Sequence, residues 1–140
     1  MPIKIATAED LPRVFEIGRA SYKNRDVGLA QRYLEDALNR SDRLFLVGNE
    51  TAGIASVTDI YGFERKARLD ILAGYGTKTA PLEAFRMVKI MLDWATKAGA
   101  KSFRLEADTG VDFAPFARRL GGALVNNPCY DIPLTEKSDG

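Results

Sequence analysis

Apolar and polar residues follow two different periods along this chain, and the change of period separates strands from helices. Apolar runs at Arg43–Val47, Ala52–Tyr61 and Ala67–Ala73 are separated by polar segments at 48–51 and 62–66. Short runs of this kind, joined by glycine-containing turns, are typical of hairpins. The pattern therefore predicts three consecutive antiparallel strands in the middle of the chain.

The third of these strands carries a charged residue inside an apolar run. Because side chains alternate along a strand, Leu69 and Ile71 are expected on one face, and Asp70 and Leu72 on the other. The alternation is therefore imperfect, since an aspartate shares its face with a leucine.

Helical periodicity is clearest in Pro81–Ala98, where Phe85, Val88, Leu92 and Ala95 form one apolar stripe. Pro81 suits the first turn of a helix, and Gly99 suits its C-terminal cap. Two further helices are expected near the N-terminus. One begins near Asp10, with Pro12 in its first turn, and the other covers about Leu29–Asn39.

The remaining segments complete the expected order. A short strand at Ile3–Ala6 opens the chain, and Ser102–Ala107 alternates as a half-buried strand. A short helix follows and ends at Gly121-Gly122, and Ala123–Val125 and Tyr130–Leu134 are expected to be two final strands. The order β-α-α-β-β-β-α-β-α-β-β predicts an α/β (α+β) fold, with one mixed, mostly antiparallel sheet and helices on both faces. Residues 1–134 are expected to form one domain and 135–140 a frayed tail.

Composition narrows the chemistry. The 140 residues carry a net charge of +1, one cysteine and no histidine. Without histidine, Ser-His-Asp and Cys-His catalysis and the usual zinc sites are excluded, and no metal is expected. No large basic field indicates nucleic acid, and no apolar run is long enough to cross a membrane. Cys129 has no histidine to activate it, and we expect a plain thiol in a cytoplasmic protein.

Several phrases together resemble the GNAT N-acetyltransferases over essentially the whole chain. Residues 3–12 are similar to the usual opening of that family, and 44–47 followed by 52–55 resemble its first hairpin. Residues 114–121 resemble the helix before its sixth strand. The resemblance implies acetyl-CoA or another acyl-CoA as cofactor, and a small-molecule or protein amine as acceptor.

In that family the cofactor pyrophosphate rests on the N-terminus of the third helix, where small residues and free amides bind the anion. The corresponding residues 79–84 keep only Ala84 of the family motif. Thr79 replaces the basic or amide residue of that motif, and Leu82 replaces its middle glycine. Glu83 adds a negative charge, and Pro81 removes an amide donor. A shifted register could use the preceding loop. The cofactor-binding residues expected on this basis are Ala73, Gly74, Gly76, Thr77, Lys78, Thr79 and Ala84. The alternative is a polar loop with a solvated lysine.

The catalytic residues are also incomplete. The alignment places Ala117 where many members of the family carry a tyrosine that protonates the departing thiolate. Tyr130 is the substitute acid, and Asp70 and Glu106 are candidate bases beside the expected cleft between the fourth and fifth strands. Alternatively, Tyr130 is a half-buried strand residue, and the two carboxylates are solvated or pair with Arg68 and Arg104.

Two functions follow from these residues. The first is an acyl-CoA-dependent N-acyltransferase, possible even with weakened chemistry because proximity does most of the work. The second is a GNAT-like domain without catalysis that serves as a structural or interaction subunit of a larger assembly with protein partners, for example a virion component. The loss of the glycine, the basic or amide residue and the tyrosine favours the second.

Overall fold

The computed structural model describes residues 2–22, 27–60, 62–106, 113–125 and 128–134. The elements are β1 (Lys4–Ile5), a 3-10 turn η1 (Ala8–Asp10), α1 (Leu11–Ser21), α2 (Val27–Ala37), β2 (Arg43–Val47), β3 (Thr51–Ile60), β4 (Glu64–Gly74), α3 (Ala80–Lys97), β5 (Phe103–Arg104) and α4 (Ala114–Arg119). The mixed fold with one mostly antiparallel sheet is therefore confirmed.

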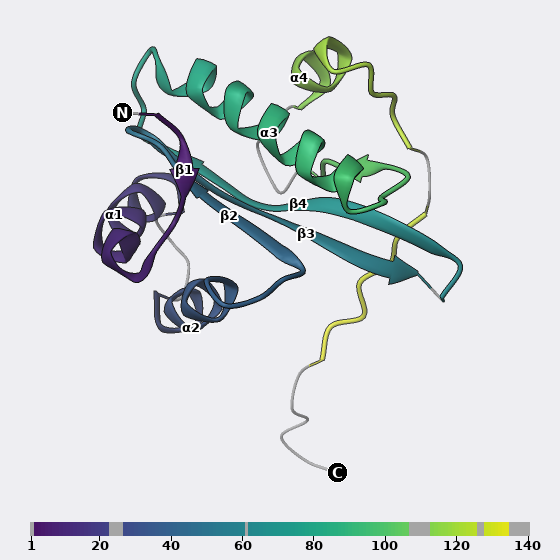
Figure 1. The fold of residues 1–140 in the computed structure, drawn as a ribbon, viewed down its shortest axis with the longest axis horizontal. Helices are drawn as coiled ribbons and strands as arrows, with labels where there is room; N and C mark the ends of the chain where they lie inside the picture. The colour runs from purple at the N-terminus through teal and green to yellow at the C-terminus, as the bar shows by residue number, and fades with distance from the viewer. Residues whose placement is uncertain (1, 23–26, 61, 107–112, 126–127, 135–140) are drawn as a thin grey trace.

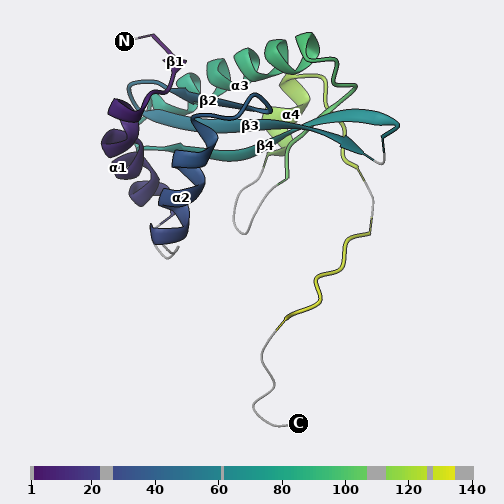
Figure 2. The same ribbon diagram turned by 60° about the horizontal axis from the view of Figure 1, so that its bottom comes forward.

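The strands lie in the order β1-β2-β3-β4-β5. The first four are antiparallel to their neighbours, and β5 runs parallel to β4. Helices α1 and α2 cover one face of the sheet and α3 covers the other, with α4 beside α3 (Figures 1 and 2). The sheet is therefore the middle of three layers.

Each face of the sheet has its own apolar core. Ile17, Val47 and Ile54 lie at the centre of the core under α1 and α2. Met87 and Met91 are fully buried in the core under α3. A Cβ atom on Gly53 would lie 2.8 Å from Cε of Met91 and 3.0 Å from Sδ of Met87, so a larger residue there would force the two methionine side chains to shift.

Local signals placed the helix ends well. Helix α3 begins one residue before Pro81, and Gly99, with φ of +87°, follows its C-cap Ala98. Gly121, with φ of +80°, lies just beyond the end of α4. Within the described part of the chain, no helix combines the length and the apolar content that a bilayer crossing requires.

The two final strands are a correction. Residues 122–125 and 128–134 have no regular structure, although Ala123–Val125 and Tyr130–Leu134 were expected to be strands. Their alternating pattern specifies which side chains share a face, but a strand also needs a neighbour that accepts its backbone hydrogen bonds. The described part of the sheet supplies none to them. Strand β5 is also shorter than Ser102–Ala107, and Ala107, 126–127 and the tail at 135–140 lie outside the described residues.

Candidate functional site

Strand β4 changes its surroundings halfway along its length. Its first half pairs on both sides, with β3 throughout and with β5 at Ala67–Phe103 and Arg68–Arg104. The register with β3 then shifts, because Ala55 pairs with Leu69 and Ile54 with Ile71, and Asp70 is the extra residue of a bulge. Beyond Arg68, the described part of β5 no longer accompanies β4, so the backbone edge of its second half needs other partners.

The bulge corrects the expected faces of this strand. Leu69 and Leu72 both pack in the core under α3, whereas Ile71 packs in the core under α1 and α2. Asp70 also points toward α2, where it accepts a hydrogen bond from Tyr33. The strict period of two fails because the extra residue rotates the strand between Leu69 and Ile71.

The end of α1 fills the open edge of β4. The Ser21 hydroxyl donates to the Gly74 carbonyl at 2.8 Å and accepts the Gly74 amide at 2.9 Å. The Tyr22 hydroxyl donates to the Leu72 carbonyl at 2.9 Å. The Tyr75 amide donates to the carbonyl of Glu50, the residue directly before β3, so by alternation the backbone groups of residues 72 and 74 face the side away from β3. Three of the backbone groups along this edge are thus already bonded.

The loop at 75–79, which precedes α3, is bonded internally as well. The hydroxyls of Thr77 and Thr79 donate to the Glu50 carboxylate, at 2.7 Å and at 2.7–2.8 Å. These are the hydroxyls expected to bind phosphate. The loop also contains Lys78, which is exposed and has no ion pair within the described part of the chain. A carboxylate of the β2–β3 turn therefore already binds the two hydroxyls.

Glu83 lies in the first turn of helix α3 and links this helix to the β2–β3 turn. Its carboxylate accepts the amides of Asn49, Glu50 and Thr51 at 2.9–3.1 Å, and the Thr51 hydroxyl at 2.6 Å. A Cβ atom on Gly48 would overlap this carboxylate. Partial burial raises the pKa of Glu83, but the hydrogen bonds outweigh it, and the pKa lies below its ordinary value. Glu83 is therefore an anion held by neutral donors.

Few amides remain at the start of α3. The Ala80 amide donates to the Thr77 hydroxyl at 3.2 Å, and the Glu83 amide donates to the Thr79 carbonyl at 3.2 Å. Pro81 has no amide hydrogen. Among the described residues, Leu82 alone offers a first-turn amide to a ligand. Anion binding at a helix start depends on several such amides.

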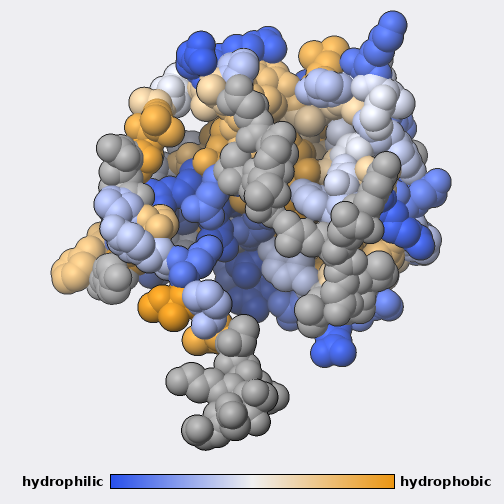
Figure 3. All heavy atoms as spheres, turned by 180° about the vertical axis from the view of Figure 1, so that it is seen from behind, coloured by the Kyte–Doolittle hydropathy of each residue, from blue (hydrophilic) through white to orange (hydrophobic). Residues whose placement is uncertain are grey.

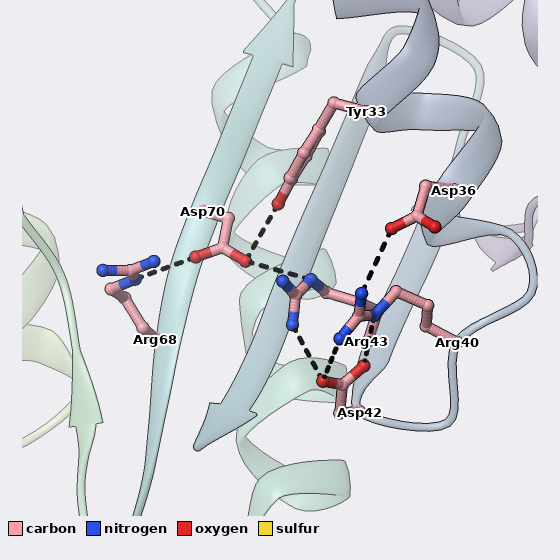
Figure 4. Close-up of polar contacts among 7 residues, drawn as sticks. All are labelled: Tyr33, Asp36, Arg40, Asp42, Arg43, Arg68 and Asp70. Atoms are coloured by element: carbon pink, nitrogen blue, oxygen red, sulfur yellow. Dashed lines mark hydrogen bonds and ion pairs between the residues drawn. The ribbon is translucent and has the colours of Figure 1, made fainter. Parts of the chain in front are cut away.

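Asp70 lies in a second polar network, on the α2 face of the sheet (Figure 4). It accepts the Tyr33 hydroxyl at 3.0 Å and Nε of Arg68 at 2.9 Å, and Nε of Arg43 lies 3.8 Å away. Arg43 in turn contacts Asp42 at 3.3 Å. Desolvation and the Asp70 charge raise the pKa of Tyr33 to about 12. The pairing with Arg68, one of the two alternatives for Asp70, is present.

The other expected site residues are scattered. Ala73 is buried in β4, Gly76 lies in the exposed loop, and Ala84 is half-buried in α3. Glu106 is exposed after β5. Tyr130 is 87% exposed on the C-terminal segment, which leads away from the domain (Figure 1). The structure thus brings the loop and helix-start residues together but places Asp70, Glu106 and Tyr130 apart from them.

An apolar cavity of about 90 Å³ lies between α1, α2 and the sheet. Phe15, Phe45 and Ile71 are among its lining residues, and a Cβ atom on Gly18 would meet no atom within 4 Å. Tyr22 lines this cavity and also bonds the edge of β4. The cavity therefore adjoins that edge. Its apolar lining would suit an apolar group rather than a phosphate.

Sequence reasoning missed the partners of these groups. The sequence shows Glu83 as a negative charge near the expected phosphates. It does not show that Glu83 accepts three amides of the β2–β3 turn. Ser21, Tyr22 and Glu50 gave no signal, because each acts on a residue at least 27 positions away. The two threonines of the loop at 75–79, together with Glu50 in the turn at 48–51, were the sequence signal available for these contacts.

No protein-family model and no curated protein sequence matches the chain. Solved structures do. An aminoglycoside 6'-N-acetyltransferase, AAC(6')-IG from Acinetobacter haemolyticus, has a TM-score of 0.79 at 16% identity, over 97% of this chain and all of its own. A structure described as a transcriptional regulator from Bacillus halodurans has a TM-score of 0.75 at 13% identity, over 95% and 99%.

A third structure, a GNAT family acetyltransferase from Staphylococcus aureus, has a TM-score of 0.66 at 10% identity and covers 95% of this chain and 98% of its own. Identities this low establish the fold alone. The chain has the GNAT fold, which confirms the resemblance found in the sequence, and its chemistry must be argued from its own residues.

Proposed function

We propose that this chain is a GNAT-fold domain whose acyl-CoA site is weakened or lost, and that it acts by binding a partner rather than by acyl transfer. One observation carries the proposal. Two carboxylates lie at the start of α3: Glu50 accepts the hydroxyls of the loop before the helix, and Glu83 accepts the amides of the β2–β3 turn. The two loop hydroxyls that a pyrophosphate would bind, those of Thr77 and Thr79, are therefore bonded within the chain.

The charges of these carboxylates oppose the cofactor. Near a protein surface, two like unit charges about 6 Å apart repel by roughly 3 kcal/mol, which corresponds to more than a hundredfold in affinity. Lys78 offers one exposed cation against them, and an exposed pair contributes little. The charge balance at the loop therefore favours an empty phosphate site at neutral pH.

Hydrogen bonding adds to this cost. A phosphate that bonded Thr77 and Thr79 would have to displace Glu50 from both hydroxyls. The pantetheine arm would meet an edge of β4 at which Ser21 and Tyr22 are already bonded. Exchanging one set of satisfied bonds for another yields little net free energy.

The bulge at Asp70 and the divergence of β4 from β5 favour acyl transfer as the second candidate. In that reaction the amine nitrogen attacks the thioester carbonyl carbon, the C–S bond breaks, the nitrogen loses a proton and the departing thiolate gains one. By alternation, the Leu72 amide lies on the open edge, where it could stabilise the oxyanion. Ser21 and Tyr22 would have to move for this chemistry.

Calorimetric titration with acetyl-CoA and with CoA separates the two functions. The wild type should show no binding at millimolar cofactor. Glu50→Ala, which frees Thr77 and Thr79 and removes a charge, should bind more tightly than the wild type. Glu64→Ala is the matched control, because it removes an exposed carboxylate at the opposite end of β4.

Micromolar binding by the wild type would overturn the proposal. In that case Lys78→Ala should weaken the binding, and a screen of amine acceptors would follow. If no cofactor binds, Lys78→Ala should leave every measured property unchanged.

A further inference from the structure

Strand β3 is longer than β2, the strand beside it. The ladder between the two ends where Arg43 pairs with Ser56, and β3 continues to Ile60. The hairpin of β3 and β4 therefore projects past β2, at the right of Figure 1 and at the left of Figure 3, which shows the molecule from behind. Residues 57–60 pair with β4 on one side, and in the described part of the chain no strand pairs with them on the other.

The backbone along this side of β3 is only partly bonded. The Val57 amide donates to the Asp42 carbonyl at 3.0 Å, and by alternation the amide and carbonyl of Asp59 point to that same side. The cross-strand neighbour Arg65 agrees, because its carbonyl faces away from β3 and accepts the Lys101 amide. Among the described residues, the Asp59 amide and the carbonyls of Val57 and Asp59 have no hydrogen-bond partner. One donor and two acceptors are therefore open to a ligand.

A groove of about 430 Å³ lies beside these backbone groups. Its lining residues come from the end of α3, the turn before β2 and the projecting part of β3, and they include Trp94, Ala98, Ser41, Asp42, Val57 and Asp59. The four projecting residues of β3 span about 13 Å, the length of a short stretch of extended chain. The groove thus combines a strand edge with an aromatic side chain.

The charged side chains of the groove already have partners. Arg65 donates to the Asp59 carboxylate at 2.8 and 3.2 Å and to the Ala98 carbonyl at 2.9 Å. Asp42 accepts two nitrogens of Arg40, each at 2.9 Å. A charged ligand would have to displace one of these pairs. The groove is therefore complementary to an uncharged ligand that carries both donors and acceptors.

We propose that this groove binds an extended, uncharged peptide segment of a partner protein, which adds a strand to the projecting part of β3. Such a segment offers a carbonyl to the Asp59 amide and amides to the carbonyls of Val57 and Asp59, and it places an apolar side chain against Trp94. Open strand edges readily take up another strand in this way. The inference does not depend on the proposed function, because Trp94 lies about 16 Å along α3 from Glu83.

Trp94 reports on the groove directly, because it is the single tryptophan of the chain. The probe is the synthetic peptide acetyl-Thr-Val-Thr-Val-Thr-amide, which is uncharged and composed of strand-forming residues. Its titration into the full chain should change the tryptophan emission and reach half-saturation below about 1 mM. The absence of a saturable change up to about 5 mM would overturn the proposal.

A modified peptide tests the hydrogen bonds from the side of the ligand. Methylation of every backbone amide nitrogen removes the peptide's donors and keeps its side chains. The methylated peptide should bind the wild-type chain at least about tenfold more weakly. If both peptides bind equally, the ligand is held by its side chains, and strand addition is wrong.

Two substitutions at residue 59 test the same bonds from the side of the protein. Asp59→Pro removes the open amide and the carboxylate but leaves the ladder with β4, because the backbone groups of residue 59 face away from β4. Asp59→Ala removes the carboxylate alone and is the matched control. The proline variant should bind the peptide about fivefold more weakly than the alanine variant. Equal affinities would contradict the proposal.

Circular dichroism checks that both variants fold. If Asp59→Pro does not, the two peptides compared on the wild-type chain decide the question. Maltose tests the other uncharged ligand that suits a polar groove with a tryptophan, and it should leave the emission unchanged. Saturable binding of maltose together with no response to the peptide would assign the groove to a sugar and overturn the proposal.

Discussion

Glu83 and Asp70 are two carboxylates that the chain satisfies in different ways. Glu83 accepts only neutral donors, three amides and one hydroxyl of the β2–β3 turn. Asp70 accepts a tyrosine hydroxyl and faces two guanidinium groups. The first arrangement resembles the way a protein binds a foreign anion, with the anion supplied by the chain itself. The second is a structural ion-pair network, in which both carboxylate oxygens of Asp70 already accept hydrogen bonds.

The two regions should respond differently when the carboxylate is removed. At Glu83 the loss of stability should be local, because the freed amides can bind water or another anion. At Asp70 the loss of stability includes a half-buried tyrosine hydroxyl left without its acceptor and the loss of a carboxylate that faces two guanidinium groups. Four experiments test this contrast, from the largest expected effect to the smallest.

Asp70→Ala should have the largest effect, a loss of about 3 kcal/mol of unfolding free energy. The side chain of Asp70 is 7% exposed, and its loss leaves the Tyr33 hydroxyl without its acceptor and removes one of the two carboxylates that face Arg43. Urea denaturation measures the change. Arg68→Ala is the control, because Arg68 is 59% exposed and should cost under about 1 kcal/mol. Equal stability of Asp70→Ala and the wild type would show that the network is not structural.

Glu83→Ala should cost about 2 kcal/mol, since four donors of the β2–β3 turn lose a charged acceptor. Glu83→Gln keeps one carbonyl acceptor and should cost less. Hydrogen exchange of the Glu50 and Thr51 amides gives the local measurement, and both should exchange faster in the alanine variant. Unchanged protection would mean that the turn is held by other contacts.

Acid should remove the contribution of Glu83. Its pKa in the folded protein lies below the ordinary value of 4.5, so its stabilisation is full above that value and is lost as the pH falls through the folded pKa. The stability difference between wild type and Glu83→Gln should therefore shrink between neutral pH and about pH 3. A difference that stays constant over this range would contradict the assigned hydrogen bonds.

Tyr33→Phe should have the smallest effect, about 1 kcal/mol, because Asp70 keeps its guanidinium partners. The pKa of Tyr33 is raised to about 12, so the folded state holds this proton more tightly, and its contribution is lost as the pH rises from the ordinary value of 10.0 toward 12. Ultraviolet titration should show a tyrosine that ionises near pH 12, and Tyr33→Phe should abolish that phase. Its persistence in the variant would assign it to another tyrosine.

Much of the fold could be predicted because its signals are local. Pro81 and Gly99 bracket α3, and the runs around 48–51 specify the first hairpin within a residue. The candidate site was predictable only as a location, the loop before α3. Its residue types were visible in the sequence, but which donors were already bonded was not, because Glu50 and Glu83 reach that region from separate elements.

The sequence by itself determined the element types and the helix ends, since these depend on neighbours within a few residues. It also excluded histidine chemistry, because the chain contains no histidine. Tertiary structure decided the rest. It placed Ser21 on the edge of β4, put a bulge at Asp70 and left the final apolar segment without a ladder. The physical reason is the same in each case. A backbone polar group must find a partner, and the nearest candidate in space is a matter of packing rather than of sequence distance.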